Sequence, residues 1–170
     1  MGWLASLPQY ATVLAVLIGG VVIDRIPRER VPLIFVFGSL GVTLSVLVAI
    51  AVADPYSSAY SLIAANFFWG LQSPAIPSTV QYHSRPEHIA STFGVVNGAG
   101  ALASAFMPLV MGWAIGFFAQ GQANQGVGFQ AGFIALTCTQ LVVFACGWLL
   151  WRREKRQESL IPPALPERSA

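Results

Sequence analysis

The sequence predicts an all-α integral membrane protein with five transmembrane helices. Of its 170 residues, 55% are hydrophobic and only 9% are charged, and the mean hydropathy is +0.65. Soluble domains carry roughly 25% charged residues, so this chain has too few to cover itself with a solvated surface. The net charge of +2 is too small to indicate nucleic acid as a partner. The lipid bilayer is therefore the expected environment of the chain.

Apolar segments of sufficient length recur along the chain. A helix needs about 20 mainly apolar residues to cross the hydrocarbon core of a bilayer. Segments of this kind cover residues 3–23, 31–53, 58–80, 89–119 and 128–151. Together they make one predicted membrane domain, residues 1–151. Residues 152–170 are charged and rich in proline, and we expect them to form a disordered tail.

Individual segments carry further signals. The first is a span rather than a secretory signal, because its charged residues follow the apolar run instead of preceding it. The third contains Pro74 and Pro77, which lack backbone donors and are expected to bend the helix. The fifth ends in Trp148 and Trp151 beside the basic tail, as interfacial anchors do.

The fourth segment has two contrasting faces. At 100° per residue, small residues and one amide gather within about a 100° arc, and bulky residues lie on the other side. The small face consists of Gly94, Asn97, Gly98, Ala101, Ala105, Pro108, Gly112 and Gly116. Gly94 with Gly98, and Gly112 with Gly116, form small-xxx-small pairs of the kind that let two helices approach closely in a membrane. We expect a second helix to pack against this face.

The positions of the basic residues predict the orientation. All nine lysines and arginines lie in the first connection, the third connection or the tail. Because basic connections stay in the cytoplasm, the N-terminus is expected outside and the C-terminus in the cytoplasm. One lysine against eight arginines indicates a GC-rich bacterial genome, so the expected location is the plasma membrane of a bacterium, its inner membrane.

The first connection contains a recognisable pattern. Gly20 is followed by Asp24, Arg25 and Arg28, with Pro27 between the last two. The pattern resembles the loop signature Gly-x-x-x-Asp-Arg-x-Gly-Arg of the major facilitator superfamily, in which Pro27 replaces the second glycine. The fourth segment, with Asn97, resembles the eleventh helix of that family. The resemblance covers residues 1–151 and implies helices eight to twelve, a partial six-helix bundle from the C-terminal half of a transporter.

Physical reasoning gives this loop a possible role in gating. Gly20 is expected to let neighbouring helices meet closely at the membrane edge. Asp24 lies at the end of its own helix, where the helix dipole disfavours a negative charge, so it needs another partner. Arg25, Arg28 or the N-terminus of an adjacent helix could supply that partner. A contact of this kind that forms in one state and breaks in another would close a gate. The alternative is a basic loop that only sets the topology.

Neutral polar residues are the candidates for a solute cavity. No Asp, Glu, Lys or Arg lies well inside a predicted span, so this part of the chain is not expected to hold a coupling charge. Asn66, Trp69 and Gln72 share an arc of about 120° near the middle of the third segment, and Asn97 lies on the fourth. These four residues could line a cavity for a small polar solute. Alternatively, the amides make hydrogen bonds between helices, worth about 0.6 to 2 kcal/mol each.

The leading hypothesis is a fragment of a secondary active transporter that works by alternating access. Its partners would be a small-molecule substrate, a coupling proton and the N-terminal half of the transporter. The third and fourth segments look most like the organic-anion:proton symporter group, which implies an organic anion as substrate. The second hypothesis is a short membrane protein that does not transport, either a structural subunit or a product of gene decay. The sequence contains no catalytic set, metal cluster or phosphate loop, so we expect no enzyme activity, cofactor or metal.

The orientation can be tested by cysteine labelling. Single cysteines are placed in residues 120–126 or in residues 25–30, in a background that lacks Cys138 and Cys146. A membrane-impermeant reagent added from outside should label the first loop and not the second, because the second carries the basic residues. The reverse labelling pattern would overturn the orientation.

Overall fold

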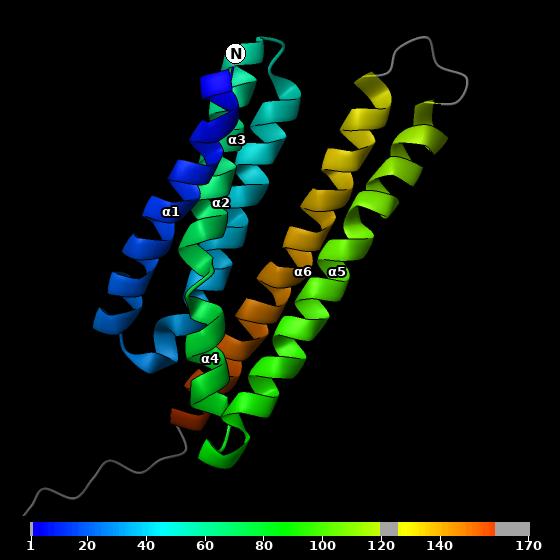
Figure 1. Ribbon diagram of the computed structural model, residues 1–170. Coiled ribbons are helices and arrows are strands. Elements are labelled where there is room, and N and C mark those ends of the chain that lie inside the picture. Colours follow the sequence, from blue (N-terminus) through cyan, green and yellow to red (C-terminus); the bar gives the residue numbers. More distant parts are fainter. Residues whose placement is uncertain (1, 120–125, 159–170) are drawn as a thin grey trace, which may run out of the picture.

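The computed structural model describes residues 2–119 and 126–158, which fold into helices joined by short connections (Figure 1). The elements, in chain order, are α1 (Gly2–Arg25), η1 (Arg28–Arg30), α2 (Val31–Ala51), α3 (Pro55–Gln72), α4 (Ala75–His83), η2 (Pro86–His88), α5 (Ile89–Ala119) and α6 (Gly126–Glu158). The fold class is all-α, as the composition predicts.

The long helices pack side by side in an order that differs from their order in the chain. The main contacts join α1 to α3, α3 to α2, α2 to α6 and α6 to α5 (Figure 1). The short helix α4 adds contacts to α1, α2 and α5. Half of the most apolar stretch of α2 is buried, whereas none of the corresponding stretch of α5 is. The row of helices is therefore centred on α2, and α1 and α5 stand at its two ends.

Two small clusters of apolar side chains hold α2 in place. Near one end, Val31 and Ile34 bury themselves against Ala75 of α4. Near the other end, Val42 and Val46 pack on Ala65 of α3, and Phe133 of α6 joins this cluster from the opposite side. The second cluster thus links three helices through α2.

Four of the described helical stretches are long and apolar enough to cross a membrane. They are Ser6–Arg25, Arg28–Ala51, Pro86–Phe117 and Gly132–Arg156. The remaining predicted segment, residues 58–80, is divided between α3 and α4, with the interruption at Ser73 and Pro74.

Proline chemistry explains the interruption. Pro74 has no backbone N–H to donate to the Gly70 carbonyl one turn earlier, and Ser73 donates to that carbonyl instead at 3.2 Å. In the same way, Pro77 cannot donate to the Ser73 carbonyl, which accepts from Ile76 at 3.3 Å. Tighter bonds between residues three apart thus satisfy the carbonyls that the two prolines leave free.

The start of α3 is set by a side-chain cap. The Asp54 carboxylate accepts hydrogen bonds from the backbone N–H and the hydroxyl of Ser57, each at 2.8 Å, and Pro55 takes the first helical position. These bonds favour the charged carboxylate and hold the pKa of Asp54 below its ordinary value. The sharp turn between α2 and α3 follows from this cap.

The connections that contain arginine gather at one end of the molecule, called here the basic end. The α1–α2 turn, the α4–α5 turn and the end of α6 all lie there (Figure 1). Helix α6 extends to Glu158, so residues 152–158 are helical rather than disordered as expected; residues 159–170 lie outside the described part of the chain. Arg152 lies over the ring of Trp148, and Lys155 over that of Trp151, at 5.4 and 5.3 Å. Contacts between residues four apart stabilise this last part of the helix.

Glycines set the close approach of α1 to α3. A Cβ atom on Gly19 would lie 2.5 Å from the backbone oxygen of Leu71, and one on Gly70 would lie 2.7 Å from that of Thr12. Gly20, by contrast, has no neighbouring atom within 4 Å of the corresponding position. The expectation that Gly20 lets helices meet is therefore wrong for the described chain. The contact uses the preceding residue, because one residue turns the helix by 100°.

Replacing these adjacent glycines should give opposite results. Gly19→Ala forces a methyl group against the backbone of α3 and should lower the free energy of unfolding by about 1–3 kcal/mol. Gly20→Ala meets open space and should raise it by about 0.5–1 kcal/mol, because alanine favours the helix. Thermal unfolding in detergent micelles measures both changes. Equal effects of the two substitutions would contradict the assigned contact.

Candidate functional site

The first candidate residue, Asn66, lies where α3 faces α1. Its side-chain amide donates to the Leu62 carbonyl at 2.9 Å, one turn earlier in the same helix. Its own backbone carbonyl is approached by the Thr12 hydroxyl of α1 at 3.4 Å. The side chain is partly buried. In this arrangement Asn66 bonds to its own helix and supports the α1–α3 contact.

Gln72 and Trp69 have opposite environments although they share one face of α3. Gln72 is 6% exposed and packs on Gly38 of α2, where a Cβ atom would lie 3.0 Å from the Gln72 Cβ. Its Oε1 is buried without a hydrogen-bond partner among the described residues. Trp69 is 51% exposed. The aromatic ring thus points to the surface, and the amide points into the contact with α2.

Asn97 lies on the exposed part of α5. The face of α5 that touches α6 includes Met111, which packs on Gly132 of α6. A Cβ atom built on any of Gly94, Gly98, Gly112 or Gly116 would find no neighbouring atom of the described chain within 4 Å. Asn97 is exposed beside them. The small face of α5, which we expected to pack on a helix, is therefore uncovered in the described chain.

The four solute-cavity candidates are consequently spread over two regions. Asn66, Trp69 and Gln72 lie on α3, and Asn97 lies on α5 at the far end of the row of helices. The described chain does not gather them around one cavity. The best-formed cavities lie instead at the basic end and are lined by other residues.

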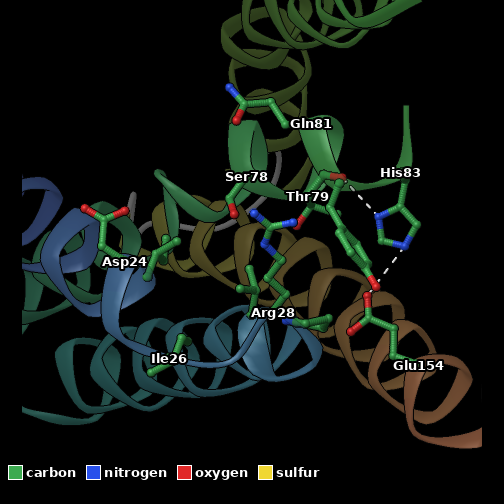
Figure 2. Close-up of a pocket in the computed structure, with 12 residues that line it drawn as sticks. Asp24, Ile26, Arg28, Ser78, Thr79, Gln81, His83 and Glu154 are labelled. Atoms are coloured by element: carbon green, nitrogen blue, oxygen red, sulfur yellow. Dashed lines mark hydrogen bonds and ion pairs between the residues drawn. The ribbon is translucent and has the colours of Figure 1, made fainter. Parts of the chain in front are cut away.

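A cavity of about 360 Å³ lies at the basic end, between the α1–α2 turn, α4 and α6 (Figure 2). Its polar lining includes Asp24 and Arg28 from the turn, Ser78 and His83 from α4, and Glu154 from α6. Val31 and Pro32 contribute apolar wall. Three parts of the chain that are far apart in the sequence therefore meet around one polar space.

Only part of the loop motif lines this cavity. Asp24 and Arg28 line it, whereas Gly20 and Arg25 do not. Figure 2 shows Arg28 reaching toward Ser78 and Thr79 of α4, and the Asp24 carboxylate directed away from Arg28. Asp24 is exposed and makes no hydrogen bond or ion pair within the described residues. The partner that the helix dipole predicts for Asp24 is not supplied by this part of the chain.

A close contact between His83 and Glu154, both of which line the cavity, was not predicted from the sequence. The Nε2 atom of His83 lies 3.5 Å from Oε1 of Glu154, and Glu154 is only 7% exposed (Figure 2). One signal for it exists in the sequence: Glu154 is an isolated acid within the basic run Arg152–Arg156. An isolated acidic residue in a basic run suggests a specific partner, but the sequence alone does not identify that partner.

Comparison with known proteins bears on the origin of this arrangement. A family model described as Major Facilitator Superfamily matches residues 1–169. The chain belongs to the major facilitator superfamily. Neither the curated proteins nor the solved structures gave a match.

Membership has direct consequences. Major facilitator proteins are transporters rather than enzymes, and they cross the membrane several times. The apolar surfaces that cover most of α1, α5 and α6 accordingly belong in a bilayer or against other membrane helices.

Gln72 offers a test of the α2–α3 contact. Gln72→Met removes a buried carbonyl oxygen that lacks a partner and keeps a side chain of similar length. It should therefore raise the free energy of unfolding by about 1 kcal/mol. The matched substitution Gln81→Met, at an exposed position of α4, should leave stability nearly unchanged. Thermal unfolding measures both, and a loss of stability in Gln72→Met alone would indicate that the amide makes a bond in the native protein.

Proposed function

We propose that this chain forms helices eight to twelve, within the C-terminal half, of a secondary active transporter. The transporter would move a small polar solute across the membrane by alternating access. Proteins of this architecture hold the solute near the middle of the membrane, between two bundles that rock against each other. The N-terminal half, the solute, a coupling proton and the bilayer are the proposed partners.

The observation that carries the proposal is the uncovered small face of α5. Helices in lipid associate through close packing, because the hydrophobic effect does not distinguish a neighbouring helix from a lipid tail. A face of glycine and alanine allows that close packing. The bulky face of α5, which includes the exposed side chains of Leu102 and Phe106, is suited to contact with lipid. The uncovered small face is therefore proposed as the surface on which another helix bundle packs. Asn97 lies within it, where an amide can meet a solute or a helix of that bundle.

Asp24 and Arg28 are proposed as parts of a gate at the basic end. The Asp24 carboxylate is exposed and unpaired in the described chain, so a helix of the other half can supply its partner. Arg28 already reaches toward α4 (Figure 2). Forming the Asp24 contact in one state and breaking it in the other would couple the loop to the rocking motion.

Asn66, Trp69, Gln72 and Asn97 remain the residues proposed for a solute cavity of the complete transporter. Of the four, Trp69 and Asn97 are exposed in the described chain. Trp69 is the best placed on α3, because it is exposed just before the break between α3 and α4. Interrupted helices near the middle of the membrane are frequent at transport sites. Burial of Gln72 against α2 supports a positioning role for that amide in the state described.

The remaining parts of the proposal concern membrane and substrate. All basic residues of the described chain lie at the basic end, which supports a cytoplasmic location for that end and an outside N-terminus. The plasma membrane of a bacterium is the proposed site. An organic anion with a coupling proton is the proposed substrate class, and the anion-binding cation would then lie in the other half.

Asn97→Leu in the complete transporter tests the role of the small face. Leucine removes the amide and adds bulk where close approach is proposed. Uptake should fall by about tenfold, which corresponds to about 1.4 kcal/mol, roughly the contribution of one hydrogen bond. The amount of folded protein in the membrane should be unchanged. Uptake of labelled solute into cells measures the effect.

The matched control is Val95→Leu, on the bulky face of the same helix, where Val95 is 72% exposed. This variant should transport normally, because the added methylene meets lipid. Normal uptake by Asn97→Leu would remove Asn97 from the transport path. A complete transcript that encodes no further spans would instead favour a short membrane protein without transport activity.

A further inference from the structure

The contact between His83 and Glu154 joins two helices at the basic end of the molecule. His83 is the last residue of α4, and Glu154 lies in the last turns of α6. Their side chains approach to 3.5 Å, between Nε2 and Oε1, beside the cavity (Figure 2). Glu154 is 93% buried, whereas about half of the His83 side chain is exposed. Water can therefore reach the pair from the His83 side.

The second ring nitrogen of His83 decides where the protons are. Nδ1 lies 3.0 Å from the backbone carbonyl oxygen of Thr79. A carbonyl can only accept a hydrogen bond, so Nδ1 must carry a proton and donate it. In a neutral imidazole the other nitrogen, Nε2, is then a bare acceptor. It is this nitrogen that faces the Glu154 carboxyl group.

The 3.5 Å contact between Nε2 and Oε1 is favourable only when one of the two side chains holds a proton there. Either His83 is doubly protonated and Nε2 donates to a carboxylate, or Glu154 is protonated and donates to Nε2. If that proton is removed, two acceptors face each other and the contact is lost. The two forms differ only in which atom holds the proton, and both keep α4 against α6.

Burial makes the fully deprotonated state unfavourable. The second carboxyl oxygen of Glu154, Oε2, is buried and has no hydrogen-bond partner among the described residues. A buried carboxylate without a partner is costly, and it avoids that cost by binding a proton or pairing with a cation. The pair therefore changes its structure, and not only its charge, when the shared proton leaves.

The surrounding charges come from several elements and have both signs. Glu29 of η1 acts on Glu154 through space, Asp24 and Arg28 line the same cavity, and Arg85 and His88 line an adjoining cavity with His83. Tyr82 stands edge-on to the His83 ring at 5.0 Å. Helices α2 and α5, which also pack against α4 or α6, contain no charged or histidine residue. Arg30 of η1, which packs on α6, and the basic residues of α6 beside Glu154 add positive charge near the pair; these residues are Arg152, Arg153, Lys155 and Arg156.

We propose that His83 and Glu154 form a proton-binding site in which one shared proton holds the end of α4 against α6. The ligand is the proton itself, taken up from the aqueous phase at the basic end. The contact is closed while the shared proton is bound, and it opens when a rise in pH removes that proton. The site stands on the geometry of this chain and does not depend on which solute, if any, is transported.

Nuclear magnetic resonance of the full chain in micelles tests the protonation pattern. The chain contains two histidines, so ¹⁵N-labelled histidine gives two side-chain patterns, and His88→Gln identifies the one from His83. Neutral His83 should carry its proton on Nδ1. A neutral His83 protonated on Nε2 would overturn the proposal, because Nε2 would then have no acceptor role toward Glu154.

A distance measurement tests the consequence for the fold. Spin labels on Gln81→Cys and Lys155→Cys, both at exposed positions, are introduced in a background with Cys138→Ser and Cys146→Ser. The distance should lengthen as the pH is raised and the shared proton is removed. In Glu154→Gln the amide N–H donates to Nε2 at every pH, so the lengthening should disappear. His88→Gln, the matched histidine control, should leave it unchanged.

Three outcomes of the distance measurement contradict the site. An invariant distance in the unsubstituted pair would show that the proton does not hold α4 to α6. Lengthening that persists in Glu154→Gln, or disappears in His88→Gln, would assign the titration to another group. Glutamine is close to glutamate in size, and a distance in Glu154→Gln equal to that of the unsubstituted pair at low pH verifies that the variant is folded.

Discussion

Close backbone contact at glycine is the constraint on which the arrangement of helices depends. Gly19 and Gly70 bring α1 against α3, and Gly147 of α6 lies against Phe35 of α2, where a Cβ atom would be 2.9 Å from the Phe35 Cβ. Between helices in a membrane, such contact replaces the hydrophobic driving force of a soluble core. The buried apolar clusters on α2 are accordingly small. Where glycine meets no neighbour, as along α5, the helix is left with its surface uncovered.

The break between α3 and α4 determines what happens at the basic end. A straight helix over residues 55–83 would continue in one direction, whereas the interruption at Ser73 and Pro74 allows α4 to lie on α2 through Ala75. That placement brings His83 to Glu154 and turns Ser78 and Thr79 toward the α1–α2 turn (Figure 2). The two prolines thus give rise to both the cavity and the His83–Glu154 contact, through the backbone donors that they lack.

The contrast between α2 and α5 connects packing with function. Helix α2 has neighbours on both sides and has the most buried apolar stretch of the four candidate spans. Helix α5 contacts α6, α4 and η2 and leaves most of its described surface exposed. In a transporter of the major facilitator superfamily, surfaces that slide past each other must pack closely without interlocking. A face of small residues satisfies both requirements, because it permits close approach and has no large side chains to interdigitate. The proposed transport function follows from this surface more than from any single residue.

The sequence by itself determined the all-α membrane class. With 55% hydrophobic and 9% charged residues, the chain cannot cover its surface with groups that water solvates, and its apolar segments are long enough to cross a bilayer as helices. It also predicted the bend at Pro74 and Pro77, since the loss of a backbone donor is a local property. Only the tertiary structure decided that Gly19, and not Gly20, makes the contact between α1 and α3. The same holds for the burial of Gln72 and the exposure of Trp69. It also holds for the contact between His83 and Glu154. These outcomes depend on how each helix is rotated and crossed against its neighbours. A rotation of 100° moves the contact from one residue to the next, and neither composition nor local pattern specifies that angle.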